Sequence, residues 1–217
     1  MALGRALLAV LTLVASGSLV AQHGEQHMHQ RFDDAEKWAK VFDDPARDAW
    51  QKPAEVIAAL RLAPDAIVAD IGSGTGYFAV RLARALPRGR VYGVDVEPDM
   101  VRFLNARAAR ENLGNLSSHA GGQEGPNLPA PVDLALVVDT YHHIPRRSRY
   151  FERLKSALRP GGRVAIVDFK PDSPTGPPAE HRIAPGQVKA EMERAGYRLQ
   201  EEPGFLPYQY FLVFTPR

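Results

Sequence analysis

The chain has 217 residues, which is enough for one domain with a sizeable core and too little for two full ones. Hydrophobic residues make up 45% and charged residues 24%, an ordinary globular balance, and the net charge of +2 gives no strong signal for nucleic-acid binding. The chain contains no cysteine, which excludes a disulfide framework, a thiolate metal site and a cysteine nucleophile.

The N-terminus has the layout of a secretory signal peptide. Arg5 supplies a positive charge, residues 6–20 are apolar or small, and polar sequence begins at Gln22. The apolar run is shorter than the ~20 residues that a membrane-spanning helix needs. We therefore expect a signal peptide over residues 1–21, a periplasmic or secreted protein, and no stable membrane insertion after cleavage. An uncleaved membrane anchor, or a cytoplasmic protein whose start codon is mis-assigned, are the alternatives.

Residues 22–52 are expected to form a His-rich linker followed by a helical lid. His23, His27 and His29 lie close together in the sequence. A solvated linker explains them better than a weak metal site, because no carboxylate or fourth ligand is fixed nearby. We expect no metal ion in the functional site.

The segment 31–60 predicts helices with one apolar face, because apolar side chains recur there at helical spacing. Pro45, which follows a capping aspartate, and Pro53 mark two helix starts. Trp38 and Trp50 belong either to a lid or to ordinary packing.

From residue 67 onward, strand patterns alternate with helix patterns, and a Pro-Gly-Gly turn is expected over residues 159–162. Repeated β-α-β units with short connections predict a doubly wound, mostly parallel α/β sheet with right-handed crossovers. The expected strands are 67–71, 90–94, 132–138, 163–169 and 210–215, and the expected helices are 77–86, 98–111, 146–158 and 185–195.

A glycine-rich turn joins the first strand of this series to the following helix. Gly74, Gly76 and Ala79 formally satisfy the spacing of a dinucleotide-binding loop. However, Asp70 lies in the strand just before the turn, where its carboxylate would repel a pyrophosphate and favours a cationic ligand such as an ammonium or a sulfonium. Asp95 ends the next strand, where a carboxylate can accept hydrogen bonds from ribose hydroxyls.

Four motifs in order make the sequence resemble the class I S-adenosylmethionine-dependent methyltransferases. They are the D-x-G-x-G-x-G motif from Asp70, the V-D-x-E-P-x-M motif at 94–100, the fourth-strand segment at 133–144 and the L-R-P-G-G-R motif at 158–163. The likeness is greatest to the subgroup of small-molecule and quinone-type enzymes. It implies a Rossmann-like methyltransferase domain over residues 53–217 with a seven-stranded sheet, S-adenosylmethionine as cofactor, and a small-molecule acceptor.

The resemblance also implies roles for the matching residues. Asp70 and the glycines would hold the methionine end of the cofactor, and Asp95 its ribose. The acidic residue usual after the third strand is missing, so Gln123 or Glu124 is expected at the adenine, unless this is a plain surface loop. The cofactor-binding candidates are Asp70, Gly72, Ser73, Gly74, Gly76, Tyr77, Asp95, Val96, Met100, Glu124 and Asp139.

Polar residues after the fourth and fifth strands are candidates for the acceptor site, because ligands bind at the carboxyl ends of parallel strands. A histidine there is suited to removing a proton, although a structural role is the alternative. The catalytic candidates are Asp139, Tyr141, His142 and His143. The substrate-binding candidates are Lys170, His181 and Arg182. Lys170 and Arg182 are expected to grip an anionic acceptor, and the alternative is that they are solvated charges.

Three functions are open at this point: a small-molecule methyltransferase, a nicotinamide-dependent oxidoreductase, and an exported, non-catalytic binding module on the same fold. Asp70 and the late Pro-Gly-Gly motif argue against the second. Export favours the third, because S-adenosylmethionine is made in the cytosol. The arsenic-methylating branch of the family relies on cysteines, and this chain has none.

Overall fold

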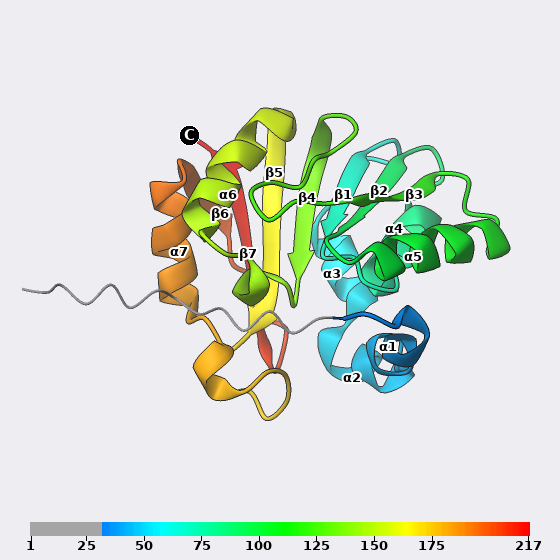
Figure 1. Cartoon of the computed structure of the whole chain (residues 1–217). Coiled ribbons are helices and arrows are strands. Elements are labelled where there is room, and N and C mark those ends of the chain that lie inside the picture. Colours follow the sequence, from blue (N-terminus) through cyan, green and yellow to red (C-terminus); the bar gives the residue numbers. More distant parts are fainter. Residues whose placement is uncertain (1–31) are drawn as a thin grey trace, which may run out of the picture.

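The computed structural model describes residues 32–217 (Figure 1). The predicted signal peptide and the cluster of His23, His27 and His29 lie outside the described residues. Within the described part, no helix is long and apolar enough to cross a bilayer.

One seven-stranded sheet with the strand order β3-β2-β1-β4-β5-β7-β6 organises the fold. Strands β1 to β5 pair in parallel, whereas β7 runs antiparallel to both β5 and β6. The prediction of a doubly wound, mostly parallel sheet is confirmed. The strands are β1 (Ile67–Ile71), β2 (Arg90–Asp95), β3 (Leu116–Ala120), β4 (Val132–Val138), β5 (Leu158–Phe169), β6 (Tyr197–Glu201) and β7 (Gln209–Pro216).

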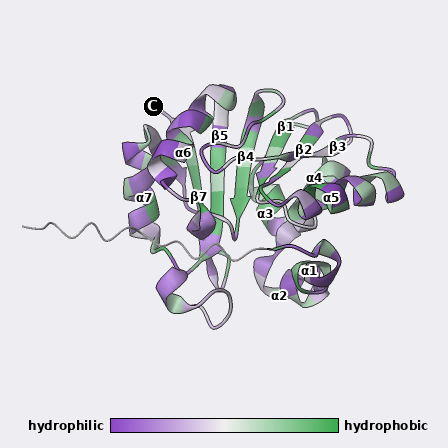
Figure 2. Ribbon diagram, viewed as in Figure 1, coloured by the Kyte–Doolittle hydropathy of each residue, from purple (hydrophilic) through white to green (hydrophobic). Residues whose placement is uncertain are grey.

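Helices cover both faces of this sheet. Alternate side chains of the central strands point to opposite faces, so Leu136 and Val167 pack with one helical layer and Val137 and Ile166 with the other. The first layer is formed by α3 (Pro53–Ala59), α4 (Tyr77–Ala85) and α5 (Pro98–Arg110), and the second by α6 (Arg147–Leu154) and α7 (Pro185–Arg194). Figure 2 shows the resulting apolar strands between helices whose outer faces are hydrophilic.

The N-terminal segment forms short helices, in line with the predicted breaks at Pro45 and Pro53. They are α1 (Ala35–Phe42), a 3-10 turn (Pro45–Arg47), α2 (Asp48–Gln51) and then α3. Helices α1 and α2 lie beyond the carboxyl ends of the central strands (Figure 1). This is the edge of the sheet where a ligand is expected.

Two predictions about the elements need correction. The turn expected over residues 159–162 is part of β5, which begins at Leu158 and is irregular in its pairing with β4. The outer strands β3 and β6 were not located by periodicity, because β3 carries Ser117, Ser118 and His119 and β6 is largely exposed. Further turns of 3-10 helix lie at Tyr141–His143, Lys155–Ala157 and Ala179–His181.

Candidate active site

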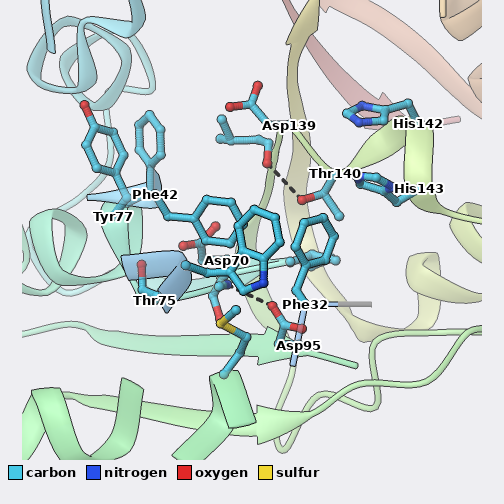
Figure 3. Close-up of a pocket in the computed structure, with 18 of the residues that line it drawn as sticks. Phe32, Phe42, Asp70, Thr75, Tyr77, Asp95, Asp139, Thr140, His142 and His143 are labelled. Carbon is cyan, nitrogen blue, oxygen red and sulfur yellow. Dashed lines mark hydrogen bonds between the residues drawn. The ribbon is translucent and has the colours of Figure 1, made fainter. Parts of the chain in front are cut away.

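A cavity of about 650 Å³ lies between the carboxyl ends of the central strands and the N-terminal helices α1 and α2 (Figure 3). Its walls come from the glycine loop after β1, the ends of β2, β4 and β5, and a loop around residues 175–178. The cavity therefore brings together residues of the sequence motifs and residues that lie far from them in the chain.

The glycine loop has a backbone that side chains would not tolerate. Gly72 and Gly76 both have positive φ angles, of 73° and 100°. A Cβ atom on Gly72 would lie 2.2 Å from Oγ1 of Thr140, and one on Gly76 would lie 2.3 Å from Cδ1 of Leu104. The loop consequently passes close to the segment that follows β4 and to α5. Gly72, Ser73 and Gly74 line the cavity, whereas Gly76 packs against Leu104 and does not.

Two carboxyl groups flank the glycine loop. Asp70 is buried, and its Oδ2 has no hydrogen-bond partner. Burial raises the pKa of Asp70 to about 7, helped by the nearby charge of Asp95 and opposed by a backbone hydrogen bond and Arg47. A buried carboxyl oxygen without a partner beside a cavity suits a cationic group of a ligand, such as an ammonium.

Asp95 organises the loop itself as well as facing the cavity. Its Oδ2 accepts a hydrogen bond of 2.8 Å from the backbone N–H of Gly74, and its Oδ1 accepts one of 3.0 Å from the N–H of Glu97. Burial is the main cause that raises the pKa of Asp95 above its ordinary value. The carboxylate also lines the cavity, where it can accept hydrogen bonds from two adjacent hydroxyl groups of a ligand.

The wall expected at an adenine is formed by Val96, Met100 and the segment 121–123. Glu124 is not part of this wall. Its carboxylate pairs instead with Arg146, at 2.7 Å, and with Arg153. The assignment of Glu124 to the adenine is therefore corrected, and Gln123 is the residue of this segment that lines the cavity.

His142 and Asp168 form a buried pair at the other end of the cavity. Nδ1 of His142 lies 2.9 Å from both carboxylate oxygens of Asp168, which also accepts the backbone N–H of His142 at 3.2 Å. Burial alone would lower the pKa of the imidazole, but the hydrogen bond and the charge of Asp168 outweigh it and raise the pKa of His142. Because Asp168 occupies Nδ1, Nε2 is the nitrogen that can accept a proton. His143 also lines the cavity, against the ring of Phe32 at 5.6 Å.

Asp139 joins the sheet to the lid. It has a positive φ of 52°, and its carboxylate accepts hydrogen bonds from Gln51 (2.8 Å), Arg47 (3.3 Å) and Gln209. Burial raises the pKa of Asp139 to about 6 against the opposing charge of Arg47. Asp139 therefore lines the cavity as an acceptor that is already held by three side chains.

Tyr141 lies away from the cavity, although it is next to His142. Its side chain is fully buried in the core on the α6 and α7 face, and its hydroxyl donates a hydrogen bond of 2.6 Å to Glu191. Successive residues of the 3-10 turn point in different directions, so only the histidines of this segment reach the cavity. The catalytic assignment of Tyr141 is corrected to a packing role.

The three substrate-binding candidates Lys170, His181 and Arg182 also lie outside the cavity. Nζ of Lys170 donates to the carbonyls of Leu206 and Pro207, and Arg182 donates to carbonyls of its own loop, such as that of Ser173 at 2.7 Å. His181 does not line the cavity either. The loop reaches the cavity through uncharged residues, among them Pro177 and Pro178.

The lid contributes residues that the sequence reasoning did not assign to a site. Arg47 stacks on the ring of Tyr77, 4.1 Å from its centroid, and Arg81 stacks on the same ring at 4.0 Å. The signal for these residues was weak, because aromatic side chains at helical spacing are equally typical of a core. The lid side chains at the cavity include Phe32, Trp38, Val41, Phe42, Arg47 and Trp50.

Comparisons with known proteins show a likeness to methyltransferases. Residues 68–162 match the family model "Methyltransferase domain". The chain is 31% identical over 156 residues to an arsenite methyltransferase of Halobacterium salinarum, covering 64% of this chain and 39% of that protein. It is also 31% identical over 135 residues to a trans-aconitate 2-methyltransferase of Rhodopseudomonas palustris, covering 61% of this chain and 48% of that one. The chain thus spans less than half the length of these two relatives.

A solved structure matches over nearly its whole length. The crystal structure of a SAM-dependent methyltransferase from Aquifex aeolicus superposes with a TM-score of 0.77 at 26% identity, covering 83% of this chain and 97% of that one. The partnerless oxygen of Asp70, the glycine loop and Asp95 fit the ammonium and ribose of the cofactor S-adenosylmethionine. Residues 68–162 therefore match a methyltransferase domain, and in sequence and fold the chain is similar to the class I S-adenosylmethionine-dependent methyltransferases.

Proposed function

We propose that the protein transfers the methyl group of S-adenosylmethionine to a small-molecule acceptor. One observation carries the proposal: the glycine loop with Asp70 and Asp95 lines the same cavity as His142, whose imidazole is held from behind by the buried Asp168. A cofactor-binding loop and a proton acceptor that open on one enclosed space are what a methyl transfer with proton removal requires.

The cofactor is held by residues on the β1, β2 and α5 side. Asp70 binds its ammonium, Asp95 accepts from its ribose hydroxyls, and Met100 packs on its adenine. S-adenosylmethionine, when bound, supplies a methyl group on a positively charged sulfur, whose transfer leaves a neutral thioether. The protein's own contribution is to align the acceptor with this methyl group and to exclude water.

His142 acts as the general base on the acceptor. Its Nε2 takes a proton from the acceptor group that is methylated, while Nδ1–H stays hydrogen-bonded to Asp168. Asp168 is a positioning residue, since it holds the imidazole in one tautomer and one orientation and touches the acceptor only through His142.

Calorimetry with S-adenosylmethionine, its demethylated product and NAD tests the cofactor assignment. We expect micromolar binding of the first two, about 7–8 kcal/mol, and none of NAD. Gly74→Val should abolish this binding, because the residue has a φ of 52° and its Cβ would lie 3.3 Å from the Phe42 ring. Gly204→Val is the matched control, since a Cβ there meets no atom within 4 Å. Normal binding by Gly74→Val, folded as judged by circular dichroism, contradicts the assignment.

Turnover of any acceptor that the wild type methylates tests the base. His142→Ala should lower turnover by ~10²–10⁴ and leave the cofactor affinity nearly unchanged. Asp168→Asn should lower turnover with the same cofactor affinity and alter the acid limb of the pH–rate profile. If His142→Ala and His143→Ala both turn over at the wild-type rate, these histidines do not remove a proton, and alignment alone accounts for the reaction.

A further inference from the structure

We propose that the acceptor side of the cavity binds an uncharged aromatic molecule that carries a hydroxyl group of phenolic acidity. The inference rests on the proposed methyl transfer and adds the class of the acceptor. Three features of the cavity carry it: its aromatic walls, its charges and the kind of base at its end.

Aromatic rings line the cavity from two directions, one beside Phe169 and one beside His143. Trp50 of the lid lies with its ring centroid 5.8 Å from that of Phe169, at the end of β5. Phe32 packs edge-on against Trp38 at 4.9 Å and lies 5.6 Å from His143. Phe32, Trp38 and Trp50 are half-buried, whereas Phe169 is buried. Flat aromatic ligands stack on partly exposed rings with a preference of about two- to tenfold over their saturated counterparts.

The charges on the wall disfavour an anionic acceptor. Among the described residues that line the cavity, Arg47 is the one arginine or lysine, and five acidic residues line it: Asp44, Asp70, Asp95, Glu97 and Asp139. Asp70 and Asp95 are assigned to the cofactor, so Asp139, three residues before His142 in the chain, is the acidic residue that bears most directly on the acceptor. Arg47 is committed, because it donates to Gln51 at 2.9 Å, to Asp139 at 3.3 Å and to the carbonyl of Phe42. A carboxylate ligand would therefore meet acidic neighbours and no unpaired guanidinium.

The base sets the acidity that the acceptor needs. An imidazole held by a carboxylate removes a proton readily from a phenolic hydroxyl, with a pKa of about 10 as in tyrosine. An aliphatic hydroxyl lies far from this range, close to water with a pKa of about 15.7. A hydroxyl group on an aromatic ring thus fits both the aromatic walls of the cavity and the basicity of His142.

A matched set of three probes tests the acceptor class on the full chain. Calorimetry at pH 7.5, with the protein saturated by S-adenosylhomocysteine, compares 2-naphthol, 2-naphthoate and decahydro-2-naphthol. We expect 2-naphthol to bind at least about tenfold more tightly than 2-naphthoate and about two- to tenfold more tightly than the saturated alcohol. Equal or tighter binding of either comparison probe, or no binding of 2-naphthol, overturns the inference. Failure of S-adenosylhomocysteine itself to bind instead overturns the proposed function, so the two failures are distinguishable.

Variants place the probe in the cavity. Trp50→Leu should weaken 2-naphthol about two- to tenfold with unchanged affinity for S-adenosylhomocysteine, and Trp50→Phe should retain most of the affinity. An equal loss for both ligands assigns the Trp50 ring to the cofactor side and overturns this placement.

The charge argument has its own variant. Asp139→Asn removes the carboxylate partner of Arg47, so the preference for 2-naphthol over 2-naphthoate should narrow at least threefold. An unchanged preference overturns the charge argument. As a second measurement on the wild type, 1 M salt should narrow the same preference, because it screens the acidic wall.

Discussion

At the scale of single residues, Asp70 is the group whose protonation a cationic cofactor would change. Its pKa of about 7 means that the carboxyl is largely neutral at pH 6 and largely ionised at pH 8. A neutral carboxyl attracts an ammonium weakly, so a cofactor that selects the ionised form releases a proton when it binds at low pH. Cofactor affinity should therefore rise with pH across this window.

The expected rise in affinity is about tenfold between pH 6 and pH 8, because the ionised fraction of Asp70 rises from about a tenth to about nine tenths around a pKa of about 7. Calorimetry in two buffers of different ionisation enthalpy measures both the affinity and the released proton. Asp70→Asn should bind the cofactor more weakly and with a flat pH dependence. A wild-type affinity that is constant over this range would contradict the contact between Asp70 and the ammonium.

Tyr141 and His142 are neighbours whose substitutions should have opposite effects. Tyr141→Phe removes the hydroxyl bonded to Glu191, which keeps its bonds to Arg147 and Gln187. We expect a loss of about 1–2 kcal/mol in the free energy of unfolding, measured in urea, with unchanged turnover. A large loss of turnover without a loss of stability would show that Tyr141 is a catalytic residue after all.

At the scale of elements, the lid is held to the domain by a few polar contacts. Arg107 of α5 donates to Asp43, at the end of α1, at 2.8 Å, and Asp99 accepts the backbone N–H of Asp34 at 3.1 Å. Helix α2 is held by Gln51 through Asp139. Such contacts are individually weak, so the lid is expected to open more easily than the sheet unfolds.

Asp43→Ala tests this view of the lid without changing a residue that lines the cavity. The amides of α1 should exchange with deuterium several times faster, because an ion pair of this kind contributes up to about 1 kcal/mol. Unfolding of the sheet should be almost unaffected. Asp33→Ala, an exposed aspartate of the same segment, is the control. Equal exchange in both variants would show that α1 is held by its apolar contacts alone.

At the scale of the whole molecule, export stays a prediction from residues 1–21. The mature protein should begin near Gln22, and mass spectrometry of the protein from its native host measures this directly. An intact Met1 on a protein without membrane association would contradict export. An intact Met1 on a membrane-bound protein would favour the uncleaved anchor instead.

Local sequence was sufficient to locate the elements that carry most of the cofactor-binding candidates. The strand, the glycine loop and the following helix are contiguous, so Asp70, Gly74 and Asp95 were identified with the elements that carry them. The central strands and most helices were predicted nearly to their ends, because burial on both faces makes the strands apolar throughout. The outer strands β3 and β6 were not predicted, because their exposed residues weaken the apolar pattern.

Only the tertiary structure decided the acceptor side. Asp168 reaches His142 because β5 lies beside β4, and Gln51 and Gln209 reach Asp139 from opposite ends of the chain. The direction of Tyr141 depends on the path of one 3-10 turn. The residues of a glycine loop are neighbours in the chain, so the loop can be recognised as a sequence motif. Side chains that converge from separate elements have no characteristic spacing in the sequence, because only the order of the strands in the sheet brings them together.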